Sequence, residues 1–166
     1  MIVLGRDHLR LICDAAEAAY PNECCGLLAG RALPSGAIEV TRVHPSPNLG
    51  KLPHRFEIDP RLWVDLARAH GKGPHKVIGL YHSHPDRPAQ PSAVDLEAAW
   101  GEELVWVIVS VAGAGEPPVD CAQAVHVTAH ILDHGGRQFR PLELRTSDWT
   151  PYPVRDLPDG ESKAGA

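Results

Sequence analysis

The sequence predicts a single domain of the α/β class, in which strands are flanked by helices. Two apolar runs, 76–81 and 104–111, have the length and the β-branched content of buried strands. Residues 6–19 instead place apolar side chains at helical spacing. With 166 residues, of which 43% are hydrophobic, the chain is long enough to bury roughly 70% of its unfolded surface in one core.

The predicted helices each have recognisable ends. The first, 6–19, stops before Pro21, which cannot continue a helix. The second opens on Asp59-Pro60, an N-cap followed by a proline in the first turn, and runs to residue 70. The third follows the N-cap Ser92 and runs to residue 100.

The other apolar or alternating segments are predicted strands, separated by turn residues. In chain order the predicted strands are 1–4, 24–30, 37–43, 56–58, 76–81, 104–111, 120–131 and 137–144. The segment 44–54 is predicted to be a loop, with His44 solvated. From about Thr146 onward Pro, Asp, Gly and Ser dominate, so residues 1–145 are predicted to form the domain and residues 146–166 a mobile tail.

Charge and composition argue against several classes of protein. The formal net charge is -5 and no cluster of Lys or Arg is present, which disfavours nucleic acid or an anionic membrane as the main partner. No apolar stretch approaches the roughly 20 residues of a membrane span, and the N-terminus has no signal-peptide pattern. The four cysteines stand in no metal-binding spacing, which predicts reduced thiols and a cytoplasmic protein.

The stretch from His82 to Asp95 carries the residues with the clearest chemistry. His82 and His84 continue the strand 76–81 at positions i and i+2, so both rings point to the same side. Their Cα atoms are expected roughly 6.5 Å apart, which suits two zinc–nitrogen bonds of about 2.0–2.1 Å. Asp95 falls in the first turn of the following helix, within reach of both histidines. Three such ligands leave the fourth position of a tetrahedral zinc ion for water, as in catalytic zinc sites.

The same residues also have structural interpretations that do not involve a metal. Ser92 and Asp95 are close to a capping box, a device that only stabilises a helix start. The two interpretations are compatible, because a capped helix can still present Asp95. Chance is a weak explanation, since roughly one chain in a thousand of this composition would show the full four-position pattern. Glu23, taken alone, is typical of a surface carboxylate.

Strand geometry disfavours two other groups that could bind metal. His126 and His130 would pair on a helix, but their context predicts a strand, which places them roughly 13 Å apart, too far for one zinc ion. Cys24 and Cys25 are adjacent, so on a strand they face opposite ways and cannot share an ion. Both are predicted to be small core residues.

The pattern around the two histidines resembles the motif of the JAMM (MPN+) metalloprotease family. In chain order the matching positions are Glu23, His82, Ser83, His84, Pro85, Ser92 and Asp95. Segments 55–60 and 77–81 also resemble the compact prokaryotic members. The resemblance therefore covers most of residues 1–145 and departs from the family at no motif position.

The resemblance implies a fold, a reaction and a role for each matching residue. The fold is a curved mixed sheet with flanking helices, related in architecture to cytidine deaminases. His82, His84 and Asp95 hold one zinc ion with its bound water. Glu23 passes a proton to the leaving amine, and Ser92 donates to the oxygen on which negative charge develops. The reaction is hydrolysis of a peptide or isopeptide bond at the C-terminal tail of a ubiquitin-like, sulfur-carrier protein.

Three alternatives to this function remain open. A deubiquitinase-like isopeptidase is one, although the short segment after Asp95 leaves no room for the second insertion of those enzymes. A non-catalytic MPN scaffold is another, against which the intact motif argues. A RadC-like DNA-associated domain is the third, although those typically carry Asn where this chain has Ser83 and add a helical DNA-binding module. Deaminase chemistry is disfavoured, because the chain lacks the His-x-Glu and Pro-Cys-x-x-Cys motifs.

Overall fold

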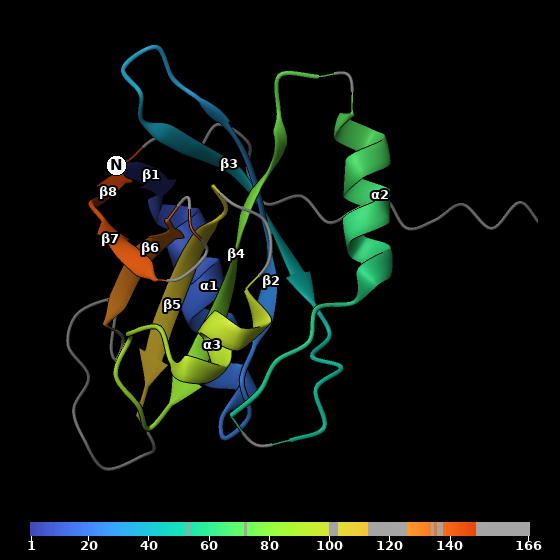
Figure 1. Ribbon diagram of the computed structural model, residues 1–166, viewed down its shortest axis with the longest axis vertical. Coiled ribbons are helices and arrows are strands. Elements are labelled where there is room, and N and C mark those ends of the chain that lie inside the picture. Colours follow the sequence, from blue (N-terminus) through green and yellow to red (C-terminus); the bar gives the residue numbers. More distant parts are fainter. Residues whose placement is uncertain are drawn as a thin grey trace, which may run out of the picture.

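An eight-stranded sheet forms the centre of the protein (Figure 1). The computed structural model describes residues 1–52, 54–71, 73–99, 103–112, 126–133, 135 and 138–148. The strands lie side by side in the order β7-β6-β5-β4-β2-β3-β1-β8. In chain order they are β1 (Ile2–Gly5), β2 (Cys25–Ala32), β3 (Ile38–Ser46), β4 (Lys76–Pro85), β5 (Val105–Val111), β6 (Val127–Leu132), β7 (Phe139–Leu142) and β8 (Leu144–Ser147).

The sheet is mixed, and it curls until its two ends approach each other. β4 runs parallel to β5, and β1 runs parallel to both β3 and β8, while the other neighbouring strands are antiparallel. The end strands β7 and β8 are separated along the chain by Glu143 alone, so the outer edges of the sheet come close together. The predicted α/β class with a curved mixed sheet is confirmed.

Two helices cover opposite faces of this sheet (Figure 1). Successive residues of a strand point to opposite faces, and Leu27 and Leu28 of β2 accordingly belong to separate core clusters. The larger cluster contains Leu28 and the buried side of α1 (Arg6–Ala19). The smaller cluster contains Leu27 and packs against α2 (Pro60–His70) through Leu66.

The helix starts follow the predicted signals. The Asp59 side chain accepts a hydrogen bond from the backbone N–H of Arg61 at 2.9 Å and so caps α2. α3 (Ala93–Ala98) begins after Ser92 and ends before the extended backbone of Ala99, earlier than predicted. Across the ranges that the structure describes, no helix has the length and apolar character to cross a membrane.

Two strands differ from the prediction: β3 is longer, and the predicted strand 137–144 divides at Glu143 into β7 and β8. β3 continues to Ser46, which places His44 inside the sheet, where it is buried instead of solvated. Burial lowers the pKa of His44 to about 4, so this side chain is neutral at neutral pH. β8 runs through Thr146 and Ser147, two residues of the predicted tail, because β1 offers it a parallel partner.

Other predicted segments are described only in part. The predicted strand 120–131 is described from residue 126 onward, where it forms β6. The predicted strand 56–58 contributes one isolated bridge, between Asn48 and Ile58. Residues 149–166 of the predicted tail lie outside the described residues.

Candidate metal centre

Two histidines project into the interior from the end of β4. Strand alternation places His82 and His84 on the same face as Leu80, above the core cluster that packs against α2. The neighbouring strands enclose them, with Cys25 of β2 and Ile108 of β5 as the partners of His82. Both side chains are therefore buried, and their Nε2 atoms lie 3.0 Å apart.

The start of α3 brings Asp95 to these histidines. The Ser92 hydroxyl accepts from the Asp95 backbone N–H at 3.1 Å. The Asp95 carboxylate accepts from the Ser92 backbone N–H at 2.6 Å and from its hydroxyl at 2.7 Å. The same carboxylate lies 3.2 Å from Nε2 of His82 and 3.3 Å from Nε2 of His84. The capping box and the presentation of Asp95 therefore coexist.

The three side chains have the spacing and the chemistry of a zinc site. One ligand atom from each lies within 4.8 Å of the others. Their separations of 3.0 to 3.3 Å resemble the edge of a tetrahedron around zinc, about 3.3 Å for bonds of about 2.0–2.1 Å. Nδ1 of His84 donates to the carbonyl of Pro88 at 2.9 Å, which leaves its Nε2 unprotonated and able to bind metal. Two imidazoles and one carboxylate fit zinc and leave one position for water.

The surroundings favour the metal-binding protonation state of these groups. Phe56 stacks on His82 with ring centroids 4.3 Å apart, and Trp106 meets the same ring edge-on at 5.9 Å. Burial lowers the pKa of His82, which keeps its imidazole neutral. Burial alone would raise the pKa of Asp95, but its interactions with His82, His84 and Ser92 together outweigh burial and hold that pKa well below its usual range. Neutral imidazole and ionised carboxylate are the forms that bind a metal.

Glu23 is buried close to this group, although its local sequence is typical of a surface carboxylate. It is 3% exposed and lies just before β2. Ser83, between the two histidines, fixes this segment: its hydroxyl accepts from the Cys24 N–H at 2.8 Å, and its own N–H donates to the Cys24 carbonyl at 3.1 Å. Burial raises the pKa of Glu23 to about 6, against the opposing charges of His84 and Arg87. A carboxyl with that pKa can accept and return a proton near neutral pH.

Arg87 also lies at the site, although the sequence did not predict it. Its Nη2 donates to Oε1 of Glu23 and forms an ion pair with it. The only signal in the sequence is position, because Arg87 follows His84 closely in the proline-rich loop. Its partner lies 64 residues away along the chain, so local spacing could not reveal the pair.

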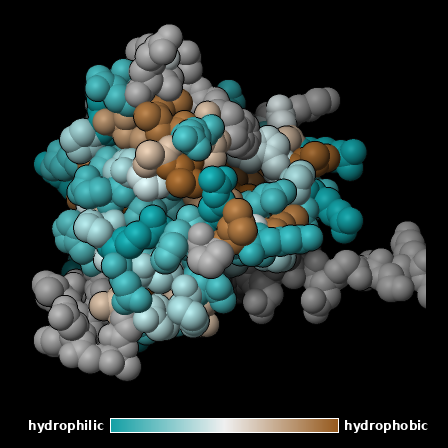
Figure 2. Space-filling view, turned by 60° about the horizontal axis from the view of Figure 1, so that its bottom comes forward, coloured by the Kyte–Doolittle hydropathy of each residue, from teal (hydrophilic) through white to brown (hydrophobic). Residues whose placement is uncertain are grey.

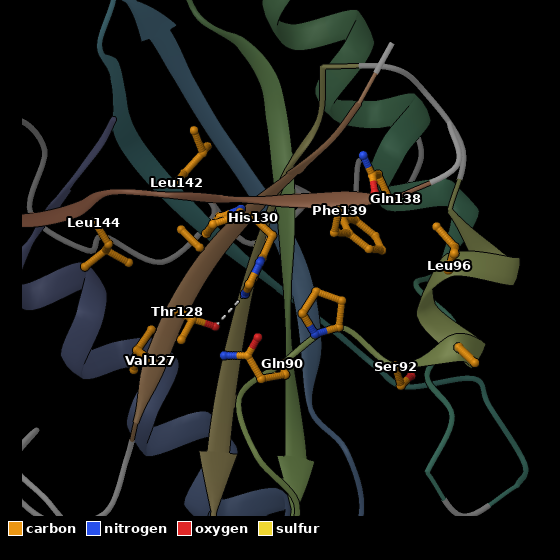
Figure 3. A pocket seen from close by; sticks show the side chains of 14 residues that line it. Gln90, Ser92, Leu96, Val127, Thr128, His130, Gln138, Phe139, Leu142 and Leu144 are labelled. Carbon is orange, nitrogen blue, oxygen red and sulfur yellow. Dashed lines mark hydrogen bonds between the residues drawn. The ribbon is translucent and has the colours of Figure 1, made fainter. Parts of the chain in front are cut away.

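Ser92 also borders a cavity of about 760 Å³ (Figure 3). Figure 3 shows Ser92 at one side of this cavity and Leu144 at the other, with His130 between them. His130 lies in β6, and its Nε2 is 2.9 Å from Oγ1 of Thr128, so it is partnered away from the metal ligands. Within the described ranges, His82, His84 and Asp95 form the only group of three His, Cys, Asp or Glu side chains spaced for a metal ion.

Comparison with known proteins identifies the family. The family model for prokaryotic homologs of the JAB domain matches residues 5–125, a range that contains every residue of the candidate site. A desampylase from Haloferax volcanii is 34% identical over 132 residues, which cover 79% of this chain and 83% of that protein. A CysO-cysteine peptidase from Mycobacterium tuberculosis is 28% identical over 110 residues, which cover 66% of this chain and 73% of that protein.

A solved structure agrees with this assignment. The solution structure of a Desulfitobacterium hafniense protein superimposes with a TM-score of 0.73 at 29% identity, and covers 90% of this chain and 94% of that one. The family resemblance seen in the motif is confirmed by the family match and by these relatives. The chain belongs to the prokaryotic JAB-domain branch of the JAMM (MPN+) family.

Proposed function

We propose that this chain is a zinc-dependent peptidase that cleaves a peptide or isopeptide bond at the C-terminal tail of a ubiquitin-like protein of the sulfur-carrier type. The observation that carries this proposal is the buried group of His82, His84 and Asp95, with the carboxyl of Glu23 close by. Zinc bound there would polarise the scissile carbonyl and lower the pKa of a bound water. The names of two relatives, a desampylase and a CysO-cysteine peptidase, support peptidase activity.

Glu23 and Ser92 carry out the other steps of the proposed reaction. Glu23 takes a proton from the attacking water and returns it to the leaving nitrogen, which a pKa of about 6 permits. The Ser92 hydroxyl donates to the carbonyl oxygen as negative charge develops there. That hydroxyl now donates to Asp95 at 2.7 Å, so this role requires it to turn toward the substrate.

The enclosed site suits a tail that ends in Gly-Gly, because only glycine lets a backbone approach so closely. A cavity of about 680 Å³ reaches from Glu23 to the loop around residues 45–55, where Leu49 and Leu52 are exposed. Figure 2, in which the bottom of Figure 1 comes forward, shows several groups of apolar residues among hydrophilic ones, the largest in the upper part of the view. We place the extended tail beside the metal ligands and the globular part of the carrier against this loop. The thiols of Cys24 and Cys25, which form no disulfide among the described residues, fit a cytoplasmic location.

A carrier protein extended past its C-terminal Gly-Gly is expected to be trimmed back to Gly-Gly in a zinc-dependent reaction. Mass spectrometry of the products identifies the bond that is cut. Replacing either glycine of the pair with alanine should slow the reaction sharply, because a methyl group obstructs the close backbone approach. If the protein ignores a panel of such carriers but cuts linked ubiquitin chains efficiently, the deubiquitinase-like alternative replaces this proposal.

Two substitutions at Ser92 separate its catalytic role from helix capping. Ser92→Ala is expected to cost about 1 kcal/mol of unfolding free energy, whereas Ser92→Gly costs only a few tenths, because glycine is a tolerable N-cap. Both substitutions remove the hydroxyl, so both should lower kcat by about 10²-fold, the usual contribution of one hydrogen-bond donor to an oxyanion hole. Chemical denaturation and steady-state kinetics on the zinc-loaded variants give the two numbers. If Ser92→Gly has a higher kcat than Ser92→Ala in parallel with its higher stability, the role of Ser92 is helix capping alone.

A further inference from the structure

The loop that leaves β4 is held by hydrogen bonds at every residue from Asp86 to Ala89. In chain order the bonds are Asp86 N–H to Val111 O at 2.7 Å, Tyr20 hydroxyl to Asp86 Oδ2 at 2.8 Å, Ser110 Oγ to Arg87 O at 2.6 Å, His84 Nδ1 to Pro88 O at 2.9 Å and Thr128 Oγ1 to Ala89 O at 2.6 Å. The backbone that carries Arg87 is therefore fixed relative to β4, β5 and β6.

From this loop Arg87 reaches the buried carboxylate of Glu23. The side chain of Arg87 is 30% exposed and that of Glu23 is 2% exposed, so the carboxylate is the more deeply buried partner. A buried carboxylate without a partner is unfavourable, and Arg87 supplies that partner. The ion pair also joins the segment before β2 to the loop after β4.

The contact between Arg87 and Glu23 is single and not bidentate. Arginine and carboxylate pair most strongly when two parallel N–H groups bind both oxygens. Here the contact runs from Nη2 to Oε1, and Nε of Arg87 is buried with no hydrogen-bond partner among the described residues. Among the described residues, the hydrogen bonds of the Glu23 carboxylate engage Oε1, and none engages Oε2.

We infer that Arg87 is a positioning residue, which holds Oε1 of Glu23 so that Oε2 is presented to the reacting water. This inference rests on the function proposed above. Arg87 acts through Glu23: among the described residues no hydrogen bond or ion pair joins its side chain to His82, His84 or Asp95, although its charge also acts on the His82 ring. Without the guanidinium, the Glu23 carboxylate can adopt other rotamers, and fewer of its conformations are competent for proton transfer.

Kinetics of zinc-loaded variants on the extended carrier test this role. Arg87→Ala is expected to lower kcat about tenfold with KM nearly unchanged, a fraction of the full effect of a general base. Arg87→Lys should restore part of the loss, because it keeps the charge but not the planar donor group. In a Glu23→Gln background, Arg87→Ala should cause no further loss, because the group that it orients no longer transfers protons. Arg145→Ala, which removes an exposed ion pair with Glu143, is the matched control and should leave kcat unchanged.

A second measurement needs no substrate. Thermal unfolding of the wild type, Arg87→Ala, Glu23→Ala and the double variant, with and without zinc, reports whether the two side chains pair in solution. The unfolding midpoint of the double variant is expected to fall by less than the sum of the decreases in the two single variants. Such non-additivity indicates a direct interaction between the two side chains. Additive losses would overturn the ion pair and the inference with it.

The outcomes distinguish a failure of the proposed function from a failure of the role inferred for Arg87. Wild-type protein that cuts no carrier refutes the proposed function, and the role of Arg87 falls with it. An active enzyme whose kcat is unchanged or raised by Arg87→Ala refutes the role of Arg87 alone, because the guanidinium would then be structural or inhibitory.

Discussion

Changing His84 to alanine is expected to remove zinc binding and to lower turnover by at least about 10³-fold, because the proposed zinc ion would supply both the activated water and the Lewis acid. The substitution takes away one of three buried ligand side chains, and the remaining His82 and Asp95 cannot complete the site. Elemental analysis of wild-type protein purified without chelators should show one zinc ion per chain, and that of His84→Ala should show none. Asp95→Asn should behave alike, because it replaces a charged ligand with a neutral amide.

The fold is expected to survive this change. Core residues such as Leu80 and Val107 are buried in the sheet independently of the metal ligands. Added zinc should raise the thermal midpoint of the wild type but not that of His84→Ala, because a ligand that binds the native state stabilises it by mass action. His130→Ala is the control, since it removes another buried histidine outside the ligand group and should keep zinc. Wild-type protein that neither contains nor binds zinc would contradict the central proposal.

Glu23→Gln is expected to lower kcat by about 10² to 10⁴-fold, the usual weight of general acid–base catalysis, while the zinc content stays unchanged. Glutamine keeps the size of the side chain and can still accept a hydrogen bond from Arg87, but it cannot take up a proton. Steady-state kinetics of zinc-replete protein measures the effect. A metal-replete variant with an unchanged rate would remove Glu23 from the mechanism.

The pH dependence of kcat/KM gives an independent check on Glu23. Burial raises its pKa from 4.5 to about 6, so the ionised form that accepts a proton is present above that pH and is lost below it. The acidic limb of the profile is therefore expected near pH 6 in the wild type and should be missing in Glu23→Gln. A limb centred near 4.5 would show that the positive charges around this carboxyl, including that of a bound metal ion, offset the effect of burial in the active protein.

Local signals in the sequence predicted the helices better than the ends of the strands. α1 occupies the predicted residues 6–19, because its apolar face and the proline after it are both encoded within a short segment. β8 was missed, because Leu144–Ser147 has no apolar alternation and becomes a strand only by pairing with β1. His44 was expected in solvent for the same reason, since the extension of β3 depends on its pairing with β2.

The same distinction applies within the site. The grouping of His82, His84 and Asp95 followed from the spacing of a strand end and a helix start that are close in sequence. The burial of Glu23 depends on the pairing of β2 with β4 and on the bonds between Ser83 and Cys24, which no local pattern encodes. Only the family motif pointed to Glu23, and the contact with Arg87 required the folded chain.

The place of β1 in the sheet has a consequence for the synthesis of this protein. β1 lies between β3 and β8, so one of its edges stays unpaired until residues 144–147 have been made. At ordinary rates of translation that interval lasts on the order of ten seconds. During this time Ile2 and Leu4, fully buried in the finished protein, lie on a strand with an open edge that can pair with other chains. The nascent chain is therefore open to aggregation through this edge until its last described strand has emerged from the ribosome.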